Sequence, residues 1–457
     1  MTTSQPTASE EKLDFKRVMP IFLVVLVDLL GLTIIIPLLP LYATTFGIDA
    51  STIGVLGAVY PIMQFIGAPL LGRLSDRYGR KPILIISQIG TLIGFLVLGF
   101  ANTLWLLFLS RIIDGLSGAN ISTAQAMIAD VTTEKTRTQG LGLLGAAFGL
   151  GFIVGPLIAF TALALSGNNY HVPAFVAAAC SAASILLSIF YLKETHNPGS
   201  ASNVKQKIGL GSFIDALRRP QIGMLLVLLF AQQVCFGGFE QILSLFTLNR
   251  LGMNASGNAI LFVFVGIFVV LVQGYFIRQW SVRYGDRKLI NLGLVALGVG
   301  LLMTAVTPSQ PVPWYSRTEL EHELTNRGAT SETMTTQSIP ITLPDDGMNG
   351  WSGLGWLIIA MVPASIGGGV LQPSINSLIT KRATQQERGG ILGVSAAFLS
   401  AANALAPLIG GALFSGIGPG APFFLWSIAL FGLLAAAWFL LRPRPDDAVM
   451  AVSAAGH

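Results

Sequence analysis

The stretch Gly72-Arg-Leu-Ser-Asp-Arg-Tyr-Gly-Arg-Lys81 lies in a short gap between two long apolar segments. It holds four basic residues, one acid and two glycines, in a chain of which only 11% of the residues are charged. Lys and Arg residues that flank membrane-spanning helices are retained on the cytoplasmic side of the membrane. The two glycines permit a tight turn and a close approach of the flanking helices. The stretch therefore predicts a cytoplasmic loop between two spanning helices.

The composition of the chain is that of a protein dissolved in lipid. Of its 457 residues 53% are hydrophobic, and the mean hydropathy is +0.69. Soluble chains reach about 45–50% only when Gly is counted as apolar. The net charge of +5 does not indicate nucleic-acid binding, because the basic residues lie in separate short loops rather than on one face. Cys180 and Cys235 both fall inside apolar segments and predict no disulfide framework.

Twelve apolar segments are near or above the length of about 20 residues that a spanning helix needs. They are 18–43, 52–72, 82–101, 104–130, 139–163 and 172–192, then 222–248, 256–279, 288–307, 352–380, 389–415 and 421–441. We predict an all-α membrane protein with twelve transmembrane helices in two pseudo-symmetric six-helix bundles.

The domain boundaries follow from the polar stretches. We expect a cytoplasmic tail over 1–17, a first bundle over 18–192, a cytoplasmic linker over 193–220, a second bundle over 221–441 and a tail over 442–457. An external insertion lies at about 308–351, and within it Ser316 to Asn326 predicts one short capped helix. The polar start leads into an apolar segment too long for a signal peptide, so we expect no cleaved leader.

The distribution of basic residues fixes the expected orientation. With both termini in the cytoplasm, all of the 27 Lys and Arg residues fall in cytoplasmic segments except Arg111, Arg250, Arg317 and Arg327. The inverse topology would place the others on the wrong side of the membrane. We therefore expect cytoplasmic N- and C-termini, and we expect a monomer.

The two halves of the chain are related in sequence. Phe46-Gly-Ile-Asp-Ala-Ser51 matches Leu251-Gly-Met-Asn-Ala-Ser256 at an offset of 205, and Arg77-Tyr-Gly79 matches Arg283-Tyr-Gly285 at 206. Further on, Pro156-Leu-Ile158 matches Pro407-Leu-Ile409 at 251, as Arg137 and Gly142 match Arg388 and Gly393. The external insertion explains the increase in offset. A parallel duplication predicts a substrate site between the halves, near the middle of the membrane.

Asp28 lies near the middle of the first apolar segment. A charged residue there costs about 2.5–3.5 kcal/mol on insertion scales. Apolar surroundings favour the neutral form of a carboxyl, which can then take up and release protons. Asp28 is thus a candidate for proton coupling or cation binding. The alternative is a structural ion pair.

Arg111 and Asp114 lie one turn apart in the fourth segment and share a helix face. Arg111 is the only basic residue inside any predicted span. If Asp28 faces the same cavity, Arg111 could compete with the proton for it, so that protonation of Asp28 would release Arg111 as a switch. The alternative is that Arg111 neutralises Asp114.

Several further polar or aromatic residues inside the spans are candidates for substrate binding, because polar atoms that face lipid are costly. Some would line the cavity and others would only bridge helices. The candidates are Gln64, Asn120, Gln125, Gln232, Gln233, Phe236, Glu240, Gln372 and Asn376, and Asn403 is a further polar group. The fifth segment is dense in small residues, including Gly151, Gly155 and Pro156, which suit close helix packing and a bend.

Over nearly its whole length the chain resembles the major facilitator superfamily. The stretch from Gly72 to Lys81 resembles that family's signature between the second and third helices. The resemblance implies a cytoplasmic gate in which Gly72 and Asp76 meet the eleventh helix. Gly79, Arg77 and Arg80 complete the gate set. In the second half Val282 replaces the acid, so the gate is expected to be asymmetric.

Three further stretches sharpen the resemblance. Leu109-Ser-Arg-Ile-Ile-Asp-Gly115 resembles the fourth-helix arginine motif linked to proton transfer, and Gly151-Phe-Ile-Val-Gly-Pro156 resembles the fifth-helix antiporter motif. Asp28, Gly31 and Pro37-Leu-Leu-Pro40 look like the first helix of twelve-helix drug:proton antiporters, especially the tetracycline-efflux group. Segment 82–101 carries no acid, whereas several tetracycline exporters have one there, so the likeness does not extend to tetracycline as substrate.

The resemblance implies a secondary transporter in the bacterial inner membrane. We expect a proton-coupled exporter of small amphipathic or drug-like molecules that works by alternating access, with protons or Na⁺ as the coupling ion. The chain has no nucleotide-binding loop and no clustered metal ligands, so we expect no enzyme activity, no cofactor, no metal and no nucleic-acid partner. The alternatives are proton-driven uptake of a sugar or organic acid, and a non-transporting membrane sensor that uses the external loop.

Overall fold

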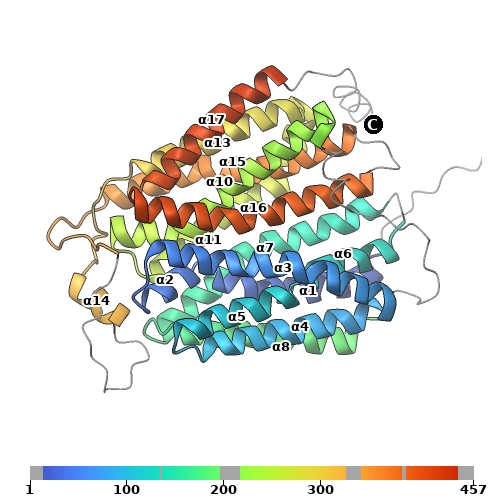
Figure 1. Cartoon of the computed structure of the whole chain (residues 1–457), viewed down its shortest axis with the longest axis horizontal. Coiled ribbons are helices and arrows are strands. Elements are labelled where there is room, and N and C mark those ends of the chain that lie inside the picture. The colour runs from blue at the N-terminus through green and yellow to red at the C-terminus, as the bar shows by residue number, and fades with distance from the viewer. Residues whose placement is uncertain (1–13, 134–135, 196–216, 326–340, 383–387, 441–457) are drawn as a thin grey trace, which may run out of the picture.

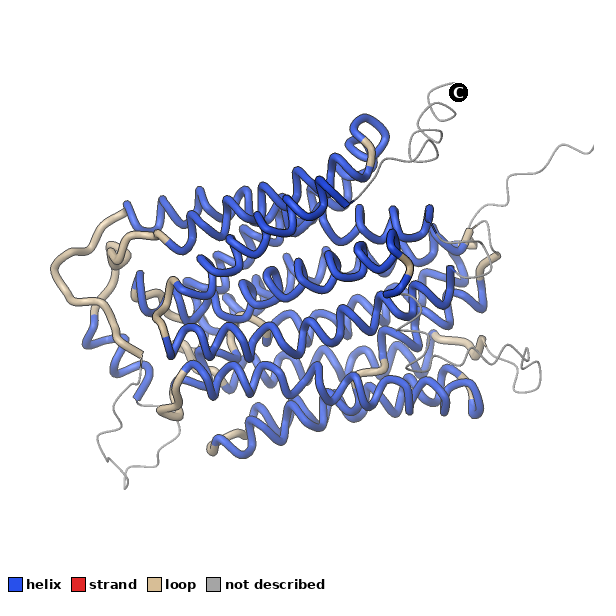
Figure 2. Tube along the Cα trace, turned by 45° about the horizontal axis from the view of Figure 1, so that its top comes forward, coloured by secondary structure: helices blue, strands red, loops and turns tan. Residues whose placement is uncertain are grey.

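The computed structural model describes residues 14–133, 136–195, 217–325, 341–382 and 388–440 (Figure 1). These residues form helices and connecting loops, without a strand (Figure 2). Among them, twelve helical segments are long and apolar enough to cross a membrane. The predicted fold class, an all-α membrane protein with twelve spans in two bundles, is confirmed.

The first bundle holds six spans, of which two are broken helices. Its helices are α1 (Phe15–Ile35), α2 (Leu39–Thr44), α3 (Ala50–Tyr78), α4 (Arg80–Gly99), α5 (Leu104–Ser117), α6 (Asn120–Val131), α7 (Arg137–Leu165) and α8 (His171–Tyr191). They occupy the lower half of Figure 1.

The second bundle lies beside the first and holds the other six spans. Its helices are α10 (Pro220–Leu251), α11 (Ala255–Leu271), the π-helix η1 (Val272–Phe276), α12 (Ile277–Tyr284), α13 (Asp286–Ala305), α15 (Ser352–Arg382), α16 (Arg388–Gly416) and α17 (Ala421–Leu440). The short helix α14 (Arg317–Thr325) matches the helix predicted from Ser316 to Asn326 and lies outside the bundles (Figure 1).

Three of the predicted segments are interrupted. The first span breaks between α1 and α2, where Pro37 has no N–H to continue the helix. The fourth span breaks at Gly118, whose N–H bonds to the Gly115 carbonyl instead of continuing the α-helical pattern. The eighth passes through η1, and π-helical turns of this kind often occur at functional sites.

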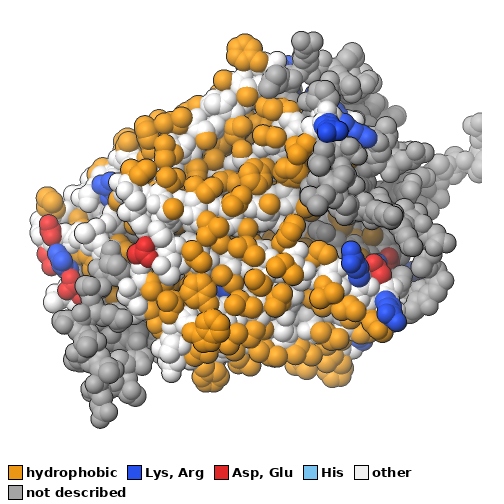
Figure 3. Space-filling model, viewed as in Figure 1, with side chains coloured by type: hydrophobic (Ala, Val, Ile, Leu, Met, Phe, Trp, Pro, Cys, Tyr) orange, Lys and Arg blue, Asp and Glu red, His pale blue; other side chains and the backbone are white. Residues whose placement is uncertain are grey.

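The surface matches a lipid environment. Large apolar side chains such as Leu70, Phe190 and Trp438 are more than half exposed. In Figure 3 apolar side chains cover the middle of the visible face, and most charged side chains lie toward its two ends. An apolar belt between two polar ends is what a spanning protein presents to a bilayer.

The bundles touch closely at the end that carries α14. A methyl group built on Gly54 of α3 would overlap the carbonyl oxygen of Pro407 in α16, and one built on Gly411 would overlap that of Ala50. Nearby, the N–H of Ser51 donates to Ser415 Oγ at 3.0 Å. Only glycine allows backbones to approach this closely.

The opposite end, where α1 begins and α17 ends, is the termini end. Gly72 of α3, Gly142 and Gly145 of α7, and Gly274 of η1 lie in the halves of their spans nearer to it. Among the described residues, no atom lies within 4 Å of a methyl group built on any of these four glycines. Gly54 and Gly411 therefore pack between the bundles, and these four glycines do not.

Candidate functional site

A cavity of about 560 Å³ lies between the two bundles, as the duplication predicts. Its lining comes from α1, α3, α5 and α7 of the first bundle and from α10, α11, η1, α15 and α16 of the second. Both halves of the chain therefore contribute to one site, and a movement of either bundle changes its shape.

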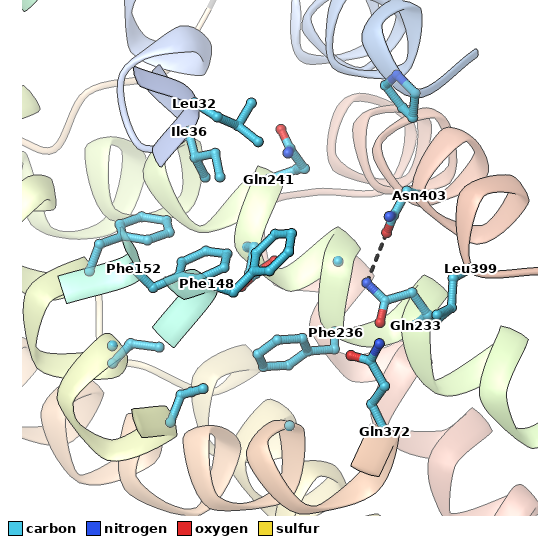
Figure 4. Close-up of a pocket in the computed structure, with 18 of the residues that line it drawn as sticks. Leu32, Ile36, Phe148, Phe152, Gln233, Phe236, Gln241, Gln372, Leu399 and Asn403 are labelled. Carbon is cyan, nitrogen blue, oxygen red and sulfur yellow. Dashed lines mark hydrogen bonds between the residues drawn. The ribbon is translucent and has the colours of Figure 1, made fainter. Parts of the chain in front are cut away.

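One side of the cavity is lined by amide side chains. Gln233 of α10 donates from Nε2 to Oδ1 of Asn403 in α16 at 2.8 Å, as the dashed line in Figure 4 shows. Gln372 and Asn376 of α15 lie one turn apart and also line the cavity. Amides donate and accept hydrogen bonds, so this wall can orient a polar group of either kind.

Aromatic and aliphatic side chains line the rest. Phe148 and Phe152 come from α7, and Phe236 comes from α10 (Figure 4). A ring at position 236 fits closely because Gly368 of α15 has no side chain, and a methyl group there would overlap the ring. Leu32 of α1 extends the apolar wall.

Among the described residues that line the cavity, Glu240 is the only acid and Arg111 the only base. Arg111 Nη1 lies 3.2 Å from Asp114 Oδ2, and both side chains are no more than 3% exposed. The guanidinium also lies 5.8 Å from the centre of the Phe95 ring. The charge of Arg111 is therefore already balanced within its own helix.

Asp28 lies in a small recess that adjoins the cavity. The recess is also lined by Asp114 and Asn120, and it shares Tyr60 and Gln64 with the cavity. Asn120 Nδ2 donates to Asp28 Oδ2 at 2.7 Å, while Asp28 Oδ1 has no hydrogen-bond partner within the described part of the chain. Asp28 therefore has one oxygen held and one free.

Tyr60 and Gln64 form the boundary between the recess and the cavity. They lie one turn apart in α3, and Gln64 Nε2 donates to the Tyr60 hydroxyl at 3.2 Å and to the Gly118 carbonyl at 2.9 Å. Gly118 is the residue at the break between α5 and α6. The break thus leaves the Gly118 carbonyl free to accept from Gln64, whereas in a continuous helix it would accept from a backbone N–H.

The predicted substrate-binding residues separate into three groups. Gln64, Gln233, Phe236, Glu240, Gln372 and Asn376 line the cavity, and Asn120 lines the recess. Gln232 is buried and donates to the Leu229 carbonyl at 3.3 Å. Gln125 is exposed on α6 and is not among the residues that line either space.

The candidate switch residues have different partners in this conformation. Arg111 pairs with Asp114, and Asp28 accepts from Asn120. Gln64 and Tyr60, rather than Arg111, connect the recess of Asp28 to the cavity.

Sequence reasoning did not single out Tyr60, Gln241, Gln273, Phe148 or Phe152, all of which line the cavity. Three of them had a signal: Tyr60 lies one turn from Gln64, Gln241 follows Glu240 directly, and Gln273 is a polar residue inside the apolar segment 256–279. The face on which Gln273 lies could not be predicted, because the π-helical turn η1 shifts the face that a regular helix would present.

The predicted gate residues form a network inside the first bundle. Arg80 Nη1 donates to Asp76 Oδ1 at 2.5 Å, and Arg80 Nε lies 3.2 Å from Asp130 Oδ2 of α6. Arg77 is exposed, and Gly72 has no neighbour that a side chain would meet. Within the part of the chain that the structure describes, no atom of α16 lies within 4 Å of a methyl group built on Gly72.

Gly79 sets the turn that brings this network together. Its φ of +102° is a value that residues with a side chain rarely adopt. The following N–H groups of Arg80 and Lys81 donate to the Glu194 carboxylate at 2.9 and 3.1 Å. A carboxylate at the first N–H groups of a helix is stabilised by the helix dipole.

The antiporter-type residues of α7 pack against α1. A methyl group built on Gly155 would overlap the Thr33 side chain, and one on Gly151 would lie 3.5 Å from it. Pro156 follows within the same helix. Close packing is thus present beside the helix that carries Asp28.

Twelve spans in two bundles around a shared central cavity define a membrane transporter of the secondary class. The model of the Major Facilitator Superfamily matches residues 21–316 and 347–453, and the chain belongs to this family. It is a multi-pass integral membrane protein and not an enzyme.

Similar proteins include proteins named for drug resistance. The chain is 26% identical to the class B tetracycline resistance protein of Escherichia coli, over 94% of this chain and 98% of that one. It is 28% identical to multidrug resistance protein 2 of Bacillus subtilis, over 59% of this chain and 68% of that one. The crystal structure of a human organic anion transporter matches 94% of this chain and all of its own, with a TM-score of 0.63 and 22% identity, which shows a shared fold.

Proposed function

We propose that this protein is a proton-coupled exporter of small amphipathic, drug-like molecules in the bacterial inner membrane. The central cavity carries the proposal, because it combines aromatic walls, an amide wall and an adjoining recess that holds Asp28. Its volume of about 560 Å³ lies inside the range of about 300–1,000 Å³ usual for small-molecule sites. Relatives named for tetracycline and multidrug resistance support export over uptake.

Asp28 is the proposed proton carrier. Its Oδ1 is free while Asn120 holds Oδ2, so a proton can bind Oδ1 without breaking the 2.7 Å hydrogen bond. The Arg111–Asp114 pair is already balanced, which leaves Asp28 as the charge of the recess that changes. Neutralising it removes a charge from the membrane interior, and this lowers the cost of burying the recess when the bundles move.

The conformation supports a cavity that is reached from the termini end. Glycine contacts join the bundles at the α14 end, whereas Gly72, Gly142, Gly145 and Gly274, toward the termini end, have no such partners in the described part of the chain. With cytoplasmic termini, this is the inward-facing state that collects substrate. Release of substrate at the α14 end requires α3 and α16 to separate at Gly54 and Pro407.

Transport into or out of proteoliposomes under an imposed pH gradient tests the proposal. The wild-type protein is expected to move a drug-like substrate opposite to protons, and Asp28→Asn is expected to abolish this coupled flux. Asp49→Asn is the matched control, because it also replaces one carboxylate by an amide but lies outside the spans, at the start of α3. Coupled flux in Asp28→Asn equal to that of Asp49→Asn would refute the role of Asp28, and movement of substrate with protons would indicate uptake.

A further inference from the structure

We propose that Glu240 is the charge selector of the central cavity, so that the protein binds flat aromatic monocations in preference to neutral molecules of the same shape. The inference rests on the proposed function, because it names the substrate class of the same cavity. It assigns to Glu240 a role separate from that of Asp28, which lies in the recess and not in the cavity lining.

The first observation is the position of Glu240. Gln233, Phe236, Gly237 and Glu240 all line the cavity, and their spacing places them on one face of α10. Gly237 leaves space between the polar groups: a methyl group there would lie 3.3 Å from Asn403 Oδ1 and 3.4 Å from Gln233 Nε2. A ligand that enters the amide corner can therefore extend along α10 toward the Glu240 carboxylate.

The second observation is that Glu240 has no counter-ion in the described part of the chain. Neither an ion pair nor a hydrogen bond reaches its carboxylate. Arg111, the only base in the lining, is 3.2 Å from Asp114 in a pair that is almost fully buried. A carboxylate without a counter-ion in a largely apolar cavity is stabilised by a proton or by a cationic ligand.

The third observation is the aromatic wall around this charge. Phe236 lies one turn from Glu240 on the same helix, and Phe148 and Phe152 face the same space from α7 (Figure 4). The faces of aromatic rings attract cations, most strongly where water is excluded. A flat cation with delocalised charge can contact these rings while its charge lies near the carboxylate.

The remaining polar groups of the lining do not select the sign of a charge. Gln233, Gln372, Asn376 and Asn403 are amides, which donate to anions and accept from cations. Glu240 therefore decides which sign of ligand charge the cavity favours. Its replacement by the isosteric Gln removes the preference for cations while keeping shape and hydrogen-bonding capacity.

Equilibrium binding to the purified full-length protein in detergent tests the inference, with no gradient present. The probes are ethidium, which is a flat aromatic monocation, and a neutral phenanthridine of similar shape. Binding of each probe is measured by its fluorescence or by quenching of the protein's tryptophan fluorescence. Glu240→Gln is expected to weaken ethidium binding by roughly tenfold or more and to leave the neutral probe within about twofold. Glu240→Asp, which keeps the charge, is expected to retain most of the preference.

Glu319→Gln is the matched control, because it makes the same change in α14, outside the cavity. Retained binding of the neutral probe shows that the Glu240→Gln protein is folded. Equal loss of both probes would mean that Glu240 is structural, no loss of either would mean that it selects nothing, and either result overturns the inference. So does failure of the wild-type protein to prefer ethidium. Binding is measured without a proton gradient. The inference about Glu240 is therefore tested independently of proton antiport through Asp28.

Discussion

The two bundles hold the same turn with opposite charges. In the first bundle Arg80 follows Gly79, and its Nε lies 3.2 Å from Asp130 Oδ2. In the second bundle Asp286 follows Gly285, and its Oδ2 lies 2.7 Å from Lys381 Nζ. Residues 80 and 286 are related by the offset of 206, and residues 130 and 381 by the offset of 251, which are the offsets of the surrounding repeats.

The comparison indicates that the fold uses an ion pair at this place, and that the acid and the base can exchange positions. The backbone is the same in both copies, because Gly79 and Gly285 both have positive φ, +102° and +77°. In each copy the pair ties the start of a helix to the end of the next span. The sign can be reversed because an ion pair between two helix ends depends on distance and burial, and both signs satisfy these.

The two pairs differ in their exposure to water. The Asp286 side chain is 2% exposed and also accepts from the hydroxyls of Ser281 and Ser377, at 2.6 and 2.7 Å. The Lys381 side chain is 32% exposed, and in the first bundle Arg80 and Asp130 are 13% and 26% exposed. Asp286 is therefore the most buried charge of the two pairs, and a buried charge that loses its partner cannot be hydrated.

The largest effect is expected from Lys381→Ala. The change leaves the Asp286 carboxylate, which is 2% exposed, without its counter-ion, and breaking a buried pair in this way costs about 3 kcal/mol. Thermal or denaturant unfolding in detergent measures the loss. A loss no larger than that of an exposed ion pair, below about 1 kcal/mol, would contradict the importance of burial.

A double variant tests whether the acid and the base of the second bundle's ion pair can be exchanged. Asp286→Arg alone places two cations together, and Asp286→Arg with Lys381→Asp gives the second bundle the polarity of the first. The double variant is expected to be more stable than the single one by about 1–3 kcal/mol, which is the usual coupling of contacting residues. Equal stability of the two would mean that the first bundle's arrangement does not transfer.

A smaller effect is expected from Arg80→Ala. Its acidic partners are partly exposed and regain water when the guanidinium is removed, so the loss is about 1–2 kcal/mol. The same unfolding experiment measures it, and Arg77→Ala, which removes an exposed arginine three residues away, is the control. The comparison fails if Arg80→Ala destabilises the protein more than Lys381→Ala does.

The smallest effect concerns the pH dependence of two equivalent helix caps. Asp49 caps α3 and Asn254 caps α11, and each lies two residues after a glycine with left-handed backbone. Hydrogen bonds from Thr52, chiefly from its hydroxyl, lower the pKa of Asp49 below its usual value. The carboxylate therefore adds stability above the unfolded pKa of about 4, and this stability is lost as pH falls through the folded pKa.

Asp49→Asn copies the cap of the second bundle into the first. At neutral pH its stability is expected to match the wild type within a few tenths of a kcal/mol, since Asn and Asp cap about equally well. Between about pH 5 and pH 2 the variant is expected to lose less stability than the wild type. Parallel unfolding curves for the two proteins across this range would show that the cap does not titrate.

The spans and their pairing into two bundles could be predicted because hydropathy and repetition act over many residues at once. The cavity lining could be predicted only in part, because it depends on helix rotation. Adjacent residues point about 100° apart, so Gln233 lines the cavity while Gln232 packs behind it. Gln125 was a candidate of the same type as Gln64, and nothing in the local sequence distinguishes the faces on which they lie.

The reversed ion pair shows a second limit of sequence reasoning. Comparing Val282 with Asp76 predicted an asymmetric gate, since the acid is missing at that position. The structure supplies a carboxylate four residues later, at Asp286, from the next helix. Its partner Lys381 is far along the chain, so a local motif could not reveal the pair.

The glycine contacts at the α14 end also determine which substitutions the chain tolerates. A side chain at Gly54 or Gly411 has no space in the present arrangement, whereas one at Gly72, Gly142 or Gly145 has all it needs. A transporter must satisfy each of its conformations with one sequence. Transport measured for alanine variants of Gly72, Gly142 and Gly145 would therefore report on a second conformation. If one of these variants folds but does not transport, we infer that its glycine is closely packed in that second conformation.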